Sequence, residues 1–107
     1  MEYLLPDSLK DCDLKIIATG KMRNNGGLKG SIAFSLTNLK DSILLWNEIK
    51  SENHVRNMNA WVHFTDSLVI SKQLNNSSSK TLRMFPYKNL GSGTFDIDDL
   101  VIELIRE

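Results

Sequence analysis

Apolar and polar residues alternate over short segments of the chain, which is the pattern expected of half-buried β-strands. The clearest case is residues 30–36, where Ile32, Phe34 and Leu36 alternate with small residues. An Asn/Gly cluster at residues 24–27 separates this segment from an apolar run at residues 13–22. Such clusters favour the positive φ angles of hairpin turns. The sequence therefore predicts a strand–turn–strand unit over residues 13–37.

Further apolar runs predict strands later in the chain. Polar or Gly-containing loops separate these runs, which lie at residues 60–64, 68–70, 81–85 and 94–106. Pro86 predicts a strand end or an edge position, because proline has no N–H to donate to a neighbouring strand. The adjacent Asp98 and Asp99 interrupt the alternation of the last run, as a β-bulge does.

Residues 39–50 fit two different structures. Leu39, Ile43, Trp46 and Ile49 have helical spacing, whereas the uninterrupted apolar residues 43–46 fit a short buried strand. With about six short strands separated by Gly, Asn and Ser turns, the expected fold is mainly all-β. We expect an antiparallel β-sandwich in which either a strand or one short helix occupies residues 39–50.

Length and charge narrow the range of functions. The 107 residues are enough for one domain over residues 1–107 and too few for two separate cores. Thirteen basic residues balance thirteen acidic residues, which argues against phosphate-driven binding of nucleic acid. The single cysteine excludes an internal disulfide framework and a multi-cysteine zinc site. No apolar run approaches the roughly 20 residues of a transmembrane helix.

Catalytic chemistry has no local signature in this sequence. Cys12 with His54 or His63 would supply a nucleophile and a base, but no known motif surrounds them. Asp96 and the Asp98–Asp99 pair are interpreted as a solvated strand face in preference to a pair of acid and base catalysts. The sequence therefore predicts a protein that is not an enzyme.

Three segments carry a resemblance to a known family. They are a strand and its successor at residues 14–18 and 30–36, a strand with one tryptophan at 59–64, and the segments 81–85 and 89–103. The last of these contains the pattern aromatic-x-Ile-Asp-Asp-aliphatic. In order and spacing, these segments resemble the later strands of jelly-roll carbohydrate-binding modules and their galactose-binding-like relatives. The resemblance covers most of the chain and implies a jelly-roll-like sandwich.

The resemblance implies a non-catalytic carbohydrate-binding or cell-surface accessory module, with a polysaccharide or other glycan as its ligand. In that family an aspartate of the Asp-Asp pair commonly holds a structural calcium ion, so Asp98 and Asp99 are the expected Ca²⁺ ligands. No sugar-binding residue transfers from the family. Trp46, Arg83 and Tyr87 are the candidate carbohydrate-binding residues, chosen for their aromatic and hydrogen-bonding character.

A complete jelly roll needs about eight strands, more than the pattern provides. The expected sources of the others are residues 1–9, a protein partner, or the rest of a parent chain of which this domain is a module. A module of a longer exported protein would lie at the cell surface or outside the cell. The alternative function is a small cytoplasmic protein-binding protein of the immunity or inhibitor type. It is suggested by the short length and by an N-terminus without the features of a secretory signal.

Overall fold

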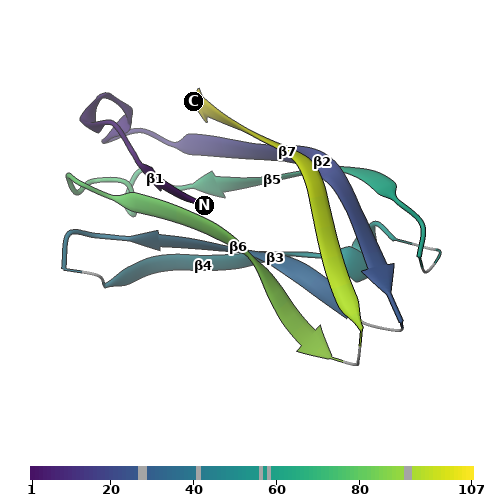
Figure 1. Cartoon of the computed structure of the whole chain (residues 1–107). Coiled ribbons are helices and arrows are strands. Elements are labelled where there is room, and N and C mark those ends of the chain that lie inside the picture. The colour runs from purple at the N-terminus through teal and green to yellow at the C-terminus, as the bar shows by residue number, and fades with distance from the viewer. Residues whose placement is uncertain (27–28, 41, 56, 58, 91–92) are drawn as a thin grey trace.

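The computed structural model has two antiparallel β-sheets packed face to face as a sandwich (Figure 1). It describes residues 1–26, 29–40, 42–55, 57, 59–90 and 93–107. The prediction of an all-β antiparallel sandwich is confirmed. The only helices in this described part of the chain are two single 3₁₀ turns, η1 (Asp7–Leu9) and η2 (Ser51–Asn53).

One sheet has four strands and the other has three. The four-stranded sheet contains, in spatial order, β1 (Glu2–Leu4), β6 (Thr81–Leu90), β3 (Lys29–Thr37) and β4 (Ile43–Lys50). The three-stranded sheet contains, in spatial order, β5 (Val62–Ile70), β2 (Leu14–Asn25) and β7 (Thr94–Arg106). In Figure 1, β2 and β7 run side by side and bend together.

The core lies between the two sheets and is built from one face of each strand. Along β2 every second residue from Leu14 to Ala18 is buried, and the same is true of Ile32, Phe34 and Leu36 in β3. This is the period of two that the sequence pattern predicts for these segments. The main apolar cluster consists of Leu5, Leu14, Ile16, Ala18, Met22, Ile32, Phe34, Leu36, Ile49, Phe64, Ile70, Leu82 and Met84.

Residues 43–50 form a strand, so the helical alternative for residues 39–50 is wrong. In β4, Ile49 pairs with Ile32 of β3 and is buried in the core, whereas Trp46 pairs with Ser35 on the opposite face. Pairing with β3 gives the backbone its hydrogen bonds along the whole segment. Helical spacing of four apolar residues could not outweigh that long-range pairing.

The strands predicted around the Asn/Gly cluster exist, but they do not pair with each other. β2, which ends at Asn25, belongs to one sheet, and β3, which begins at Lys29, belongs to the other. Residues 27 and 28 of the Asn/Gly cluster lie outside the described residues. The buried Asn24 holds the end of β2 in place. Its Nδ2 donates to Ser51 Oγ at 2.9 Å, and its backbone carbonyl accepts the Asn59 N–H at 2.7 Å.

Two other local predictions are confirmed. The register of β7 against β2 shifts between Thr19 and Lys21, and Asp99 has a φ of 51°, so Asp98 and Asp99 do mark a β-bulge. Pro86 lies where β6 has a partner on one side only. Met84 exchanges two backbone hydrogen bonds with Met1, and Pro86, two residues on, is directed to the same side beyond the end of β1.

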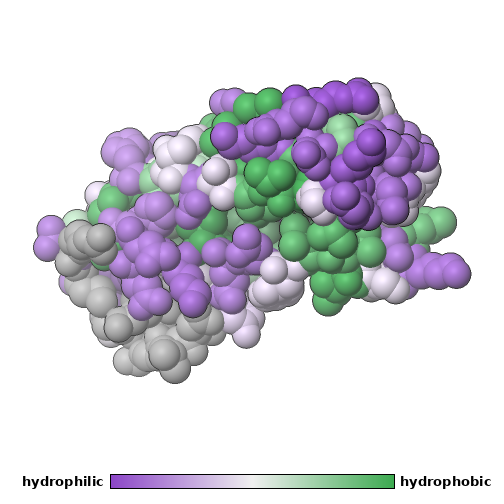
Figure 2. All heavy atoms as spheres, turned by 180° about the vertical axis from the view of Figure 1, so that it is seen from behind, coloured by the Kyte–Doolittle hydropathy of each residue, from purple (hydrophilic) through white to green (hydrophobic). Residues whose placement is uncertain are grey.

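Large apolar side chains also remain on the surface. Seen from the back, hydrophobic side chains reach the surface through the middle of the molecule, between hydrophilic areas (Figure 2). Clusters of exposed apolar residues often mark interaction surfaces, so their positions guide the search for a site. The exposed large apolar residues are Met1, Tyr3, Leu4, Leu39, Ile43, Trp46, Trp61, Val69, Leu74, Tyr87, Val101 and Ile105.

The packing of Gly30 against Phe95 provides a test of this fold. A Cβ atom at Gly30 would lie 2.4 Å from Phe95 Cγ, because the two sheets approach closely at this end. Gly30→Ala should therefore lower the free energy of unfolding by about 1–3 kcal/mol, measured by urea denaturation. In the double variant with Phe95→Leu the cost should be less than the sum of the two single costs. A fully stable Gly30→Ala protein would contradict this packing.

Candidate functional site

Strand β3 is buried on both of its faces. Its core-facing residues are apolar, and its outward-facing residues, Ser31, Ala33, Ser35 and Thr37, are buried as well. Ser31 and Ala33 have 0% exposure although they point away from the core. Because these side chains are small, longer side chains from the two neighbouring strands can cover them. β3 therefore forms a floor on the outer face of the four-stranded sheet.

Three aromatic side chains lie over this floor. In the strand register Trp46 of β4 is opposite Ser35, while Phe85 and Tyr87 of β6 are opposite Ala33 and Ser31. Residues paired in this way share one face of the sheet. The ring centroid of Trp46 is 5.7 Å from that of Phe85 and 5.9 Å from that of Tyr87, and both contacts are edge-to-face.

Trp46 and Tyr87 are the exposed members of this aromatic cluster, at 43% and 41%. Edge-to-face contacts between aromatic rings are favourable beyond the area that they bury, so the rings support one another in fixed positions. The outer face of the four-stranded sheet therefore presents an ordered aromatic surface to solvent.

Arg83 lies on the same face, beside the aromatic cluster. In the register Arg83 and Trp46 flank Ser35 from opposite sides. Arg83 Nε donates to Glu2 Oε1 at 2.6 Å, and its Nη1 donates to Thr37 Oγ1 at 3.4 Å. The hydrogen bond from Arg83 lowers the pKa of the Glu2 carboxyl. These contacts hold the guanidinium at the edge of the aromatic surface.

Glu48 supplies an acceptor on the other side of the floor. It is opposite Ala33 in β4, and its Oε1 accepts a hydrogen bond from the Ser31 hydroxyl at 2.8 Å. The aromatic surface thus has a carboxylate along one side and a guanidinium along another. We call the set formed by Trp46, Phe85, Tyr87, Arg83 and Glu48 the platform.

The structure therefore brings together all three candidate carbohydrate-binding residues, Trp46, Arg83 and Tyr87. Sequence reasoning missed Phe85 and Glu48. The sequence contained a signal for both, because residues at i and i+2 of one strand share a face of the sheet. Phe85 therefore shares a face with Arg83 and Tyr87, and Glu48 shares a face with Trp46.

Asp98 and Asp99 lie far from this platform, at the bulge of β7 in the other sheet. The Asp99 carboxylate is 3.1 Å from Lys21 Nζ. Asp98 Oδ1 accepts the backbone N–H of Asp99 at 2.9 Å. The neighbouring Asp96 is engaged by Arg23 Nη2 at 2.8 Å, and this contact lowers the pKa of Asp96.

The two aspartates supply only part of the ligand set of a calcium site, so the predicted Ca²⁺ ligation stays a prediction. Ca²⁺ takes six to eight oxygen ligands, usually from several carboxylates and carbonyls. Within the described ranges, no group of three or more His, Cys, Asp or Glu residues is placed to hold a metal ion. Lys21 also offsets the charge of Asp99. The structure gives the acidic pair a part in the bulge and in an ion pair with β2.

The second tryptophan, Trp61, has a different setting. Arg23 Cζ lies 4.4 Å from the centre of its ring, a cation–π arrangement on the outer face of the three-stranded sheet. Trp61 has the same exposure as Trp46, 43%, but the Arg23 guanidinium lies over one face of its ring and is held there by Asp96. Trp61 is therefore a matched control for Trp46.

The cysteine and the histidines lie in separate parts of the sandwich. Cys12 is buried just before β2, with its Sγ 3.3 Å from the Leu9 carbonyl. His63 pairs with Lys21 towards the other end of β2. His54 Nε2 is 3.2 Å from Asp66 Oδ2. The structure does not bring the thiol to either imidazole.

Comparison with known proteins adds no relative. No protein-family model, curated protein or solved structure matches the chain. In the part of the chain that the structure describes, no helix has the length and apolar character needed to cross a membrane.

The incomplete ligand set leads to a direct test of the calcium prediction. The melting temperature should be the same in excess EDTA and in millimolar CaCl₂, because two aspartates alone do not form an ion cage. A site occupied at a hundred times its Kd would add about 2.7 kcal/mol of stability. A rise of several degrees with CaCl₂, abolished by the double variant Asp98→Asn, Asp99→Asn, would establish a calcium site after all.

Proposed function

We propose that this protein is a non-catalytic carbohydrate-binding module that holds a glycan against the platform. The observation that carries this proposal is the exposed Trp46–Tyr87 pair lying over a buried small-residue floor, with Arg83 and Glu48 beside it. Binding sites of this kind combine apolar surface with a few fixed polar groups that give orientation.

The chemistry of a sugar ring suits this surface. One face of a pyranose carries mainly C–H groups, which pack against aromatic rings, while its hydroxyl groups need donors and acceptors at the periphery. Arg83 offers N–H donors and Glu48 offers carboxylate oxygens, and hydrogen bonds to charged groups are the stronger kind. The edge-to-face contacts keep the rings ordered before binding, which reduces the entropy lost when a ligand binds.

The strand order supports a jelly-roll-like fold. In an eight-stranded jelly roll, one sheet holds the first, eighth, third and sixth strands, and the other holds the second, seventh, fourth and fifth. If the first strand is removed and the other seven are renumbered along the chain, the spatial order of strands is seven, two, five in one sheet. In the other sheet the order is one, six, three, four. These are the orders seen here. The fold that we propose is a jelly roll without its first strand.

The polar groups of the platform are held by contacts within the chain, as suits a surface that binds a ligand in one orientation. Glu48 hydrogen-bonds to Ser31, and Arg83 is held by Glu2. The Ser31 hydroxyl is fully buried beneath the rings, so these contacts fix the two polar groups in place. We propose that the module attaches a larger assembly, or the surface that carries it, to a glycan.

Two tryptophan variants, one at the platform and one on the other side of the sandwich, test this function. The intact protein is first screened against plant, host and bacterial polysaccharides on an array, and the best ligand is titrated by calorimetry. Trp46→Ala should weaken binding tenfold or more, a loss of at least about 1.4 kcal/mol, because it removes the centre of the aromatic surface. Trp61→Ala, with an equally exposed ring on the other sheet, should change the Kd less than twofold.

Two results would contradict the proposal. One is uniform failure to bind across the three classes of polysaccharide. The other is an equal loss of affinity in the two tryptophan variants, which would place the ligand elsewhere. Far-UV circular dichroism and thermal melts of each variant show whether a loss reflects binding or folding.

A further inference from the structure

The two sheets differ in width, and the difference leaves one strand position empty. β1 extends the four-stranded sheet past β6, but the three-stranded sheet ends at β7 (Figure 1). The result is a groove of about 470 Å³. Met1, at 60% exposure, and Tyr3, at 45%, line it and have no cover. Its other apolar walls are Leu82 of β6 and Leu100, Ile102 and Leu104 of β7.

The wall formed by β7 is a free strand edge. β7 pairs with β2 on one side, and on the other side no described strand pairs with it. Its inward residues after the bulge are all apolar, and its backbone N–H and C=O groups along the groove face an open position. An exposed and largely apolar strand edge is a template for pairing with another chain.

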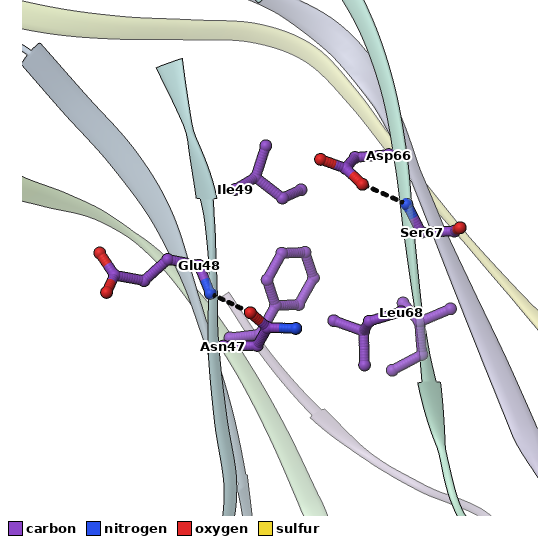
Figure 3. A pocket seen from close by; sticks show the side chains of 8 residues that line it. Asn47, Glu48, Ile49, Asp66, Ser67 and Leu68 are labelled. Carbon is purple, nitrogen blue, oxygen red and sulfur yellow. Dashed lines mark hydrogen bonds between the residues drawn. The ribbon is translucent and has the colours of Figure 1, made fainter. Parts of the chain in front are cut away.

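The other edges of the sandwich are protected. On β5, Asp66 occupies an inward position opposite the core residue Ala18, and on β4 Asn47 does so opposite Phe34. Both polar groups bend back to their own strand, each accepting the next residue's N–H at 2.8 Å (Figure 3). The cavity between these edges is only about 30 Å³. On β6, Pro86 blocks pairing beyond β1.

The second half of β7 has neither a proline nor an inward charge. The remaining edge strand, β1, is only three residues long, and very short edge strands offer little backbone for pairing. The contrast with β7 indicates that the β7 edge is covered when the protein acts. The strand order leads to the same position. In an eight-stranded jelly roll the first strand lies beside the last, which here is the open side of β7, facing β1.

The charges along β7 indicate the chemistry of the missing strand. Glu103 points outward opposite Ile17 of β2, with Lys15 diagonal to it, and forms no ion pair with any residue that the structure describes. Arg106, near the end of the strand, donates to the Ser8 carbonyl at 2.9 Å. A strand beside β7 would place apolar side chains over Ile102 and its inward neighbours. It would place its alternate side chains beside Glu103, where a lysine or arginine is favourable.

We propose that this groove is filled by an extended segment of a partner protein, antiparallel to β7, with apolar residues alternating with basic ones. The segment completes the three-stranded sheet as a fourth strand. This inference rests on the jelly-roll reading of the strand order and on the groove. It does not depend on glycan binding.

The probe is a fluorescein-labelled eight-residue peptide that alternates lysine with valine, leucine or isoleucine, titrated with the full chain by fluorescence anisotropy. It should bind at least tenfold more tightly than a peptide of the same composition that has all its lysines in one block. It should also bind more tightly than the acidic peptide in which each lysine is replaced by glutamate. Glu103→Lys should reverse the preference between the basic and acidic peptides. Glu103 is exposed and unpaired, so this variant should fold normally.

Backbone pairing is tested with N-methylated peptides. Only every second amide of an added strand points to β7. Of two isomers methylated on alternate residues, one should lose at least tenfold in affinity and the other should bind nearly as well as the parent. In the antiparallel arrangement a nitroxide at the peptide N-terminus should broaden the amide signals of Ile105 and Glu107 more than that of Leu100.

Each remaining outcome overturns the proposal. Equal binding by both methylated isomers, or by the block peptide, would indicate charge attraction without strand addition. If no peptide binds at millimolar concentration, the proposal that a partner strand fills the groove is wrong. A concentration-dependent dimer with shifted β7 amide signals would assign the groove to a second copy of the chain. Glycan affinity of the Glu103→Lys variant should be unchanged, so the two proposals can fail separately.

Discussion

The burial of β3 on both faces is the constraint on which the rest of the molecule depends. Ile32, Phe34 and Leu36 fill the core from one side of this strand, while Ser31, Ala33 and Ser35 leave only a shallow floor on the other. Because the floor is shallow, Trp46 from β4 and Phe85 and Tyr87 from β6 can meet above it. Large residues at these outward positions would separate the rings. The platform is thus a consequence of small side chains in a central strand.

The short strand β1 connects the two surfaces proposed for binding. Its neighbouring residues point in opposite directions, so Glu2 holds Arg83 at the platform while Tyr3 faces the groove beside β7. The proposed glycan surface and the proposed strand position therefore meet at β1, because Glu2 contacts Arg83 and also lines the groove. A partner strand packed over Tyr3 would steady β1, and with it the Glu2–Arg83 contact.

Much of the fold was predictable from local pattern, and what was not depended on long-range pairing. Alternation identified β3, and the adjacent aspartates identified the bulge in β7. Turn chemistry at residues 24–27 indicated a reversal of the chain, but it contains no information on whether the next strand joins the same sheet. For residues 39–50, pairing with β3 decided between helix and strand. Trp46, Arg83 and Tyr87 were chosen by side-chain character, and only the register of β3 with both neighbours places them together.

The most direct test places a larger side chain in the floor beneath the rings and leaves the platform residues themselves unchanged. Ala33→Leu is made in a Trp61→Phe background, so that Trp46 is the one remaining tryptophan. The far-UV circular dichroism should be unchanged and unfolding should stay cooperative, whereas the near-UV signal of the packed rings and the binding of glycan should both be lost. An unchanged near-UV spectrum with full binding would show that the platform does not depend on the small residues of β3.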